Sequence, residues 1–360
     1  SLSRYCRAGM AALTHGGAGA SGAVRPLPPK LILHFDVNET IMLADPAGGD
    51  SFEDCCNKII AKSALVRLAP DGSMQQRWYD GTAMTFSSAP PPPPLNTDWE
   101  APAGCARYYY KCADDGKKAV FAQDGEAGAQ YRALKDRMVA RVAWPAEGLA
   151  TADERLCKDG RHVLIPAFFR TISTLAAQGR EFTVVIRTFV RPPPRAATAI
   201  NHLADSLPAA QGTDIAEVQE ALAAFAEGKH PTCAPVAEMA SCPLYTGRYD
   251  ESGTFTLTSA AGETTKDEPS VLAILQGSGG EAQAVRAVGC TDDYPWWSKH
   301  GKAASAGKPL WLTEGDKAHH HIFFDDNIKN EPVESIVGCE NSRDPRLRCR
   351  RRKKHGKAPH

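Results

Sequence analysis

The stretch KLILHFDVNET, residues 30–40, decides how the rest of the chain is interpreted. Apolar residues fill four of its first six positions, and Asp36, Asn38 and Thr40 follow them. A short apolar run that ends in polar residues is typical of a buried strand whose last residues reach a functional edge of a sheet. The sequence therefore predicts that Asp36 lies at the end of a central strand.

Two later segments continue this pattern. Pro166 begins a helix with an apolar stripe, Gly179 ends it, and a β-branched strand at residues 182–186 then leads to Thr188. A helix that passes through glycine into such a strand is a unit of a parallel α/β sheet. The stretch HIFFDD, residues 321–326, is another apolar strand that delivers acids. We therefore predict an α/β fold around an open parallel sheet.

Other elements follow from local signals. Ser51 and Asp54 form a capping box for a helix that reaches about Leu68. We also expect a hairpin of residues 107–113 and 118–122, a helix over 130–142, a helix that begins near Asp214 and ends at Gly228, a second hairpin around 251–253, and one short strand within 334–338.

The length of 360 residues suits one large domain with insertions or two domains. Five consecutive prolines, Pro90 to Pro94, cannot join a sheet interior, so they indicate an exposed loop within an insertion. The predicted division is a disordered or leader segment at 1–30, a core at 31–68 and 150–338, a first insertion at 69–149, a second insertion, partly core, at 191–290, and a basic disordered tail at 339–360.

Charge and cysteine content limit the classes of function. The formal net charge is zero, but nine Lys and Arg against one Asp in residues 343–360 leave the body acidic. The body thus lacks a basic surface for nucleic acid, and the tail is the candidate nucleic-acid or nuclear-import segment. No apolar run is long enough to span a bilayer, so we expect no membrane association. Eleven cysteines without zinc-ligand spacing indicate free thiols in a reducing compartment, which favours the cytoplasm, with an organelle or the nucleus as alternatives.

Three predicted strands end in polar residues, and these ends are expected to meet. In an open parallel sheet, the carboxyl ends of the strands line one crevice. Asp36, Thr188 and the pair Asp325-Asp326 would converge there, with Lys308 just upstream of the last strand. Carboxylates bind Mg²⁺, a hydroxyl and a lysine bind phosphate, and a carboxylate can attack phosphorus.

This ordered set resembles the haloacid-dehalogenase-like (HAD-like) superfamily of phosphoaspartate phosphohydrolases. The first motif of that family, D-x-D-x-T or V after an apolar strand, compares with residues 36–40, DVNET. The second compares with Thr188, the third with Lys308-Pro309, and the fourth with Asp325-Asp326. The match covers roughly residues 31–68, 160–190 and 300–338. It implies a three-layer Rossmann-like parallel sheet of HAD type, with the two insertions in the places of cap domains that select the substrate.

The resemblance also implies roles for these residues. Asp36 would be the nucleophile that forms an aspartyl-phosphate on a phosphorylated small molecule. Mg²⁺ would be held by Asp36, by the backbone carbonyl of Asn38, and by Asp325 or Asp326. Thr188 and Lys308 would bind phosphoryl oxygens. Lys302 competes with Lys308 for this role, and the proline after Lys308 favours Lys308.

Asn38 departs from the family pattern. Many phosphatases of this family carry an acid at this position, which protonates the leaving group and then activates water. An amide can do neither, so we expect poor hydrolysis of unactivated esters. The first alternative is a catalytically weak or inactive HAD-fold protein that binds a phospho-ligand or a protein. The second is a nucleic-acid-associated factor that uses the basic C-terminal tail.

Overall fold

The computed structural model of the chain describes residues 28–45, 48–88, 95, 101–189, 213–278, 286–313, 315–328 and 336–338. Residues 1–27 of the expected leader or disordered segment, the proline run and the basic tail lie outside the described residues. None of the described helices is long and apolar enough to cross a lipid bilayer. All the described cysteines are free thiols, as expected.

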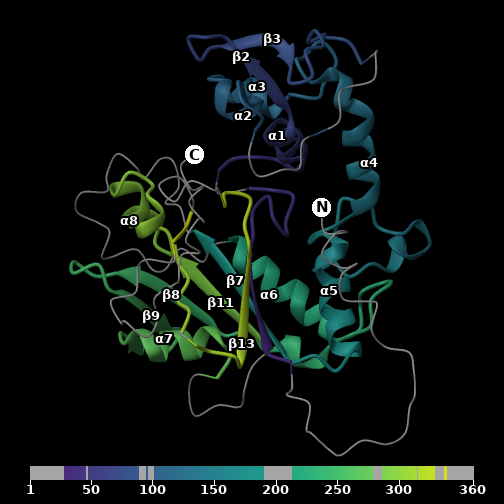
Figure 1. The fold of residues 1–360 in the computed structure, drawn as a ribbon. Helices are drawn as coiled ribbons and strands as arrows, with labels where there is room; N and C mark the ends of the chain where they lie inside the picture. The colour runs from purple at the N-terminus through teal and green to yellow at the C-terminus, as the bar shows by residue number, and fades with distance from the viewer. Residues whose placement is uncertain are drawn as a thin grey trace, which may run out of the picture.

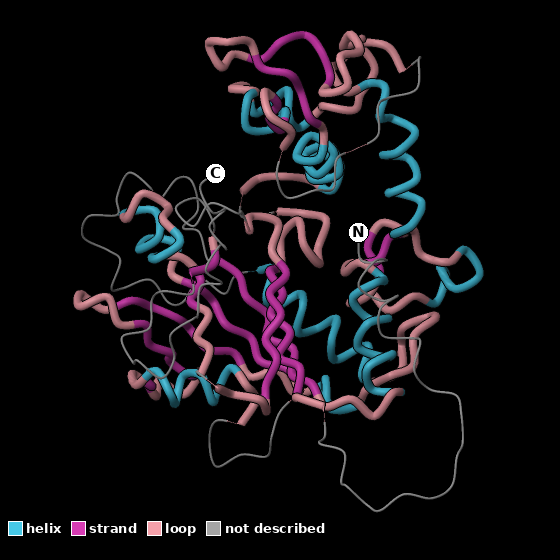
Figure 2. The backbone as a smooth tube through the Cα atoms, viewed as in Figure 1, coloured by secondary structure: helices cyan, strands magenta, loops and turns pink. Residues whose placement is uncertain are grey.

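A seven-stranded sheet forms the centre of the fold (Figures 1 and 2). Its strand order is β10-β9-β8-β11-β7-β1-β13, and every neighbouring pair from β8 to β13 is parallel. The β10-β9-β8 edge is antiparallel. The strands are β1 (Lys30–Asp36), β7 (Phe182–Phe189), β8 (Leu244–Tyr249), β9 (Phe255–Ser259), β10 (Thr264–Thr265), β11 (Ala287–Asp292) and β13 (His319–Phe324). The predicted α/β class with a mostly parallel sheet is confirmed.

Helices cover both faces of this sheet. Alternate residues of a strand point to opposite faces, so Leu33 packs with α5 (Pro166–Ala177) and α6 (Thr213–Ala226), while Ile32 packs with α7 (Glu268–Leu275). The central strand β7 is buried along nearly its whole length. The run Val184-Val185-Ile186 at its centre is what burial on both faces requires.

A second core lies under a small three-stranded sheet, β3-β2-β4. Helix α1 (Phe52–Ser63) has the predicted capping box of Ser51 and Asp54. Its buried residue Ile60 packs with Trp78 and Phe121 of this second core, so α1 packs with the first insertion rather than with the large sheet. The strands and helices of this part are β2 (Leu65–Leu68), β3 (Met74–Trp78), β4 (Cys105–Arg107), α2 (Tyr108–Lys111), α3 (Asp115–Ala119) and α4 (Arg132–Val142).

The hairpin expected at residues 107–113 and 118–122 is wrong. The chain forms α2 and α3 instead. Asp114 accepts a hydrogen bond from the Lys117 backbone N–H and caps α3, so Asp115 and Gly116, the expected turn of the hairpin, begin a helix instead. Tyr108 is buried beside Phe121, which ties both helices to α1.

Much of the expected second insertion belongs to the central sheet. Strand β8 and its hairpin partner β9 extend the sheet, and the hairpin turn falls at the expected residues 251–253. Strand β11 gave no sequence signal that we recognised, although all six of its residues are buried. The remaining elements are β5 (Cys157–Lys158), β6 (Arg161–His162), β12 (Lys308–Pro309), β14 (Val337–Gly338) and α8 (Tyr294–Lys299).

Two histidines join β1 to the edge strand β13. The rings of His34 and His321 stack at 5.4 Å, and Gln276 lies 3.3 Å from His321 Nε2. The Gln276 amide is a donor, so His321 Nε2 accepts and the ring proton of His321 lies on Nδ1. His321 Nδ1–H then donates to His34 Nε2 at 3.1 Å. Burial lowers the pKa of His34 well below its usual value and lowers the pKa of His321 to about 4. Both rings are therefore neutral near pH 7.

Because the pKa values of both histidines are lowered, we predict that the protein loses stability in acid. A lowered pKa means that the unfolded chain binds the proton first, so stability is present above pH 6.5 and falls as the pH drops toward 4. We expect His321→Gln to flatten this decline by up to about 1.4 kcal/mol per pH unit, measured by urea unfolding at pH 4.5–7. His320 is exposed on the same strand, so His320→Gln is the matched control. An unchanged acid slope in His321→Gln would contradict the assignment.

Candidate functional site

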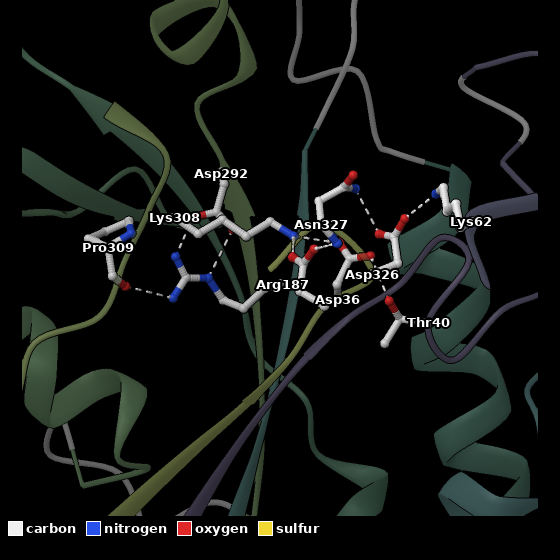
Figure 3. A network of polar contacts seen from close by, with 10 residues as sticks. Asp36, Thr40, Lys62, Arg187, Asp292, Lys308, Pro309, Asp326 and Asn327 are labelled. Carbon is white, nitrogen blue, oxygen red and sulfur yellow. Dashed lines mark hydrogen bonds and ion pairs between the residues drawn. The ribbon is translucent and has the colours of Figure 1, made fainter. Parts of the chain in front are cut away.

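The carboxyl ends of β1 and β13 bring three aspartates together (Figure 3). Asp36 is the last residue of β1, and Asp325 and Asp326 follow β13. The parallel register pairs Phe35 with Phe324, so the next residues on the two strands are Asp36 and Asp325. Carboxylate oxygens of the three aspartates lie within 4.8 Å of one another. The expected convergence of these acids is therefore present.

Lys308 lies among these carboxylates and is completely buried. Its ammonium donates to Asp36 Oδ1 at 2.5 Å and to Asp325 Oδ2 at 2.8 Å. Thr40 donates to the other oxygen of Asp36 at 3.1 Å. Both oxygens of the Asp36 carboxylate thus have a donor, which fixes its orientation.

Asp326 pairs with a different ammonium, that of Lys62 on α1, the helix that packs with the first insertion. Lys62 on α1 donates to Asp326 at 2.5 Å and also pairs with Glu39. Glu39 follows Asn38 in a left-handed backbone conformation, φ 56°, so the chain turns sharply just after the candidate first motif. The side chain of Asn327 donates to the other oxygen of Asp326 at 2.8 Å.

The charges of this cluster do not balance. Four carboxylates, those of Asp36, Glu39, Asp325 and Asp326, face the two ammonium groups of Lys62 and Lys308. The formal excess is two negative charges, which equals the charge of one divalent cation. A group of close, hard oxygen donors fits Mg²⁺ or another divalent cation, which binds carboxylates and retains several waters.

Burial shifts the pKa values of the charged groups in the cluster. Desolvation raises the pKa of Asp36 well above its usual range, although Lys308 opposes this shift. Desolvation likewise raises the pKa of Asp325, and raises that of Asp326 to about 6 against the effect of Lys62. Burial alone would lower the pKa of Lys308, but the charges of Asp325 and Asp36 raise it above its usual value. Lys308 is therefore a permanent cation in this site.

Asn38 turns its side chain toward α6. Its Nδ2 donates to Asp214 Oδ2 at 2.8 Å, and Asp214 is buried. A carboxylate at position 38 would face the carboxylate of Asp214 at this distance, which is unfavourable. The amide is therefore the residue that suits this position. The metal-binding role of the Asn38 backbone carbonyl stays a prediction.

Thr188 does not join the hydrogen-bond network. It lies near the carboxyl end of β7 and is buried, but Arg187 is the residue of β7 that pairs with Asp36. Because neighbouring strand residues face opposite sides, Thr188 points away from the side chain of Arg187. No hydrogen bond joins it to Asp36 or Lys308 within the described residues, so its phosphate-binding role stays a prediction.

Lys302, the competitor of Lys308, lies outside the cluster. It is exposed, and its ammonium lies 5.6 Å from the centre of the Trp297 ring. The choice of Lys308 from the proline that follows it therefore agrees with the geometry.

Several residues of the network gave no usable sequence signal. Lys62 and Asn327 contact the acids directly, and Arg187 forms a fully buried ion pair with Asp292 near Lys308 (Figure 3). Arg187 lies in an apolar strand, where a fully buried arginine requires a partner. That requirement is the one signal that pointed to an acid nearby, and it does not identify which acid.

Comparisons with known proteins identify no relative of this chain. No protein-family profile matches the sequence, and no curated protein or solved structure matches it either. Function is therefore inferred from the geometry of the site.

The cluster predicts a large difference between its two candidate lysines. Lys308→Met leaves buried carboxylates without their cation, so we expect a loss of roughly 3–5 kcal/mol in the free energy of unfolding, measured with urea. The matched control Lys302→Met removes an exposed ammonium and should change stability by less than about 1 kcal/mol. Equal losses in the two variants would show that the ammonium of Lys308 does not compensate the buried acids.

Proposed function

We propose that this chain is a Mg²⁺-dependent phosphohydrolase or phosphotransferase of HAD type, which acts on a phosphorylated small molecule through Asp36. The observation that carries the proposal is the position of the Lys308 ammonium between Asp36 and Asp325, at the adjoining ends of two parallel strands. This arrangement puts an oriented carboxylate, a permanent cation and two further acids within one small volume.

Asp36 supplies the nucleophile in this proposal. Thr40 and Lys308 hold its two oxygens, so the carboxylate is already oriented before the substrate binds. Little conformational entropy of this side chain is then lost on binding. An oxygen of Asp36 forms a bond to phosphorus as the bond to the leaving oxygen breaks, and the leaving group takes that electron pair. Attack of water on the same phosphorus then releases phosphate and restores the carboxylate of Asp36. An acceptor alcohol in place of water gives phosphotransfer.

The neighbouring residues balance charge. Lys308 is buried and permanently cationic, so it stabilises negative charge on the phosphoryl oxygens where water cannot screen the interaction. Asp36, Asp325 and Asp326 would hold Mg²⁺, together with the Asn38 carbonyl. When bound, this ion offsets the repulsion between the carboxylates and a phosphate dianion. The two excess negative charges of the cluster support this role.

One observation supports the weaker alternative, a phospho-ligand binder with little turnover. The Asn38 amide is engaged with Asp214 and has no proton to transfer to a leaving group. We therefore expect activated esters to react and unactivated alkyl phosphates to react poorly. A protein that binds phosphate without releasing it from any ester would fit the alternative.

The test is phosphate release from 4-nitrophenyl phosphate. Turnover should require Mg²⁺, and Asp36→Asn should lower it by at least about a thousandfold, because the amide is not a nucleophile. Asp124 is an acid of the first insertion whose side chain is 64% exposed, so Asp124→Asn is the matched control and should keep full activity. Turnover that persists in Asp36→Asn, or that needs no divalent cation, would refute the mechanism.

A further inference from the structure

Lys308 has little secondary structure of its own. It lies in β12, a strand of two residues that pairs with the equally short β14. Its backbone N–H donates to the carbonyl of Ile336 at 2.8 Å. A strand of two residues is a weak anchor for a side chain that must hold its ammonium between two carboxylates. Other contacts must therefore fix this segment.

Two side chains hold the carbonyls on either side of Lys308. The hydroxyl of Tyr249, at the end of β8, donates to the carbonyl of Gly307 at 2.9 Å. The guanidinium of Arg187, on β7, donates from Nη1 to the carbonyl of Pro309 at 3.3 Å (Figure 3). The peptide unit before Lys308 and the peptide unit that follows Pro309 are thus both tied to the central sheet.

Both donors are themselves fixed by the end of β11. Arg187 donates from Nε to Asp292 Oδ2 at 2.9 Å and from Nη2 to Oδ1, and neither side chain of the pair is exposed. The backbone N–H of Tyr249 donates to Asp293 Oδ2 at 2.9 Å, and the Tyr249 ring stacks on Trp296. Two consecutive aspartates therefore anchor the two donors, so the position of Lys308 depends on β7, β8 and β11.

The segment also has no room to shift. A Cβ atom on Gly307 would lie 2.0 Å from the carbonyl oxygen of Ile336. Glycine is required because the two backbones approach this closely. Contacts on both sides of Lys308 thus restrict where its ammonium can lie.

We propose that Tyr249 and Arg187 are positioning residues for Lys308, holding the carbonyl groups of Gly307 and Pro309 on either side of it so that its ammonium lies between Asp36 and Asp325. The effect of these residues on phosphate binding rests on the proposed function, whereas the positioning itself does not. Tyr249 offers the cleaner variant, because Tyr249→Phe removes only a hydroxyl and keeps the stacked ring.

The experiment is a double-mutant cycle between Tyr249→Phe and Lys308→Met. Affinity for inorganic phosphate in Mg²⁺ is measured by calorimetry, and the urea midpoint is measured without any ligand. In the native background Tyr249→Phe should weaken phosphate binding about 3- to 10-fold, the range expected for one hydrogen bond. In the Lys308→Met background it should have no effect on phosphate affinity, and its shift of the urea midpoint should be smaller.

The matched control is Tyr245→Phe, a hydroxyl deletion four residues earlier on β8. It should leave phosphate affinity unchanged in both backgrounds. If Lys308→Met does not fold, Lys308→Gln replaces it, because an amide keeps a donor between the carboxylates. Equal effects of Tyr249→Phe in both backgrounds, on affinity and on the urea midpoint, would overturn the proposal. Non-additive midpoints without phosphate binding would support the positioning and refute the proposed function.

Discussion

The structure depends on one buried cation, the ammonium of Lys308 between Asp36 and Asp325. A buried charge is tolerated only when it is paired and hydrogen-bonded, and here each partner belongs to a different strand. Without this contact, unpaired charge would be buried at the ends of the strands. The ends of β1 and β13 and the strand β12 therefore have to lie close together. The site and the fold are therefore held by the same interaction.

The main strands and the acids at their ends could be predicted from the sequence, because those signals are local. The apolar runs before Asp36 and Asp325, and the helix-glycine-strand unit before Thr188, are each visible within about 25 residues. Parallel pairing then brings the strand ends together without further information. The order of the candidate motifs predicted Lys308. Its strand has only two residues, too few to show a periodic pattern.

The parts that could not be predicted depend on contacts between distant residues. Lys62 is one lysine on an amphipathic helix, and nothing local distinguishes it from Lys58 beside it, which pairs with Asp50 instead. Strand β11 contains small residues and a glycine, so its buried position comes from its neighbours rather than from its own pattern. The expected hairpin failed for a related reason, since Asp115 and Gly116 are typical of a turn, whereas the preceding Asp114 caps a helix that they begin.

The contact of Lys62 with Asp326 gives the first insertion a direct connection to the acids of the large sheet. Lys62 comes from α1, whose apolar face belongs to the core of the insertion. A cation that bound Asp326 Oδ2 would compete with this ammonium for that oxygen. By thermodynamic reciprocity, a change that weakened the Lys62 contact would strengthen binding of such a cation, and the cation would weaken the contact by the same free energy. The salt bridge would thus couple cation occupancy at the acids to the packing of α1 with the first insertion.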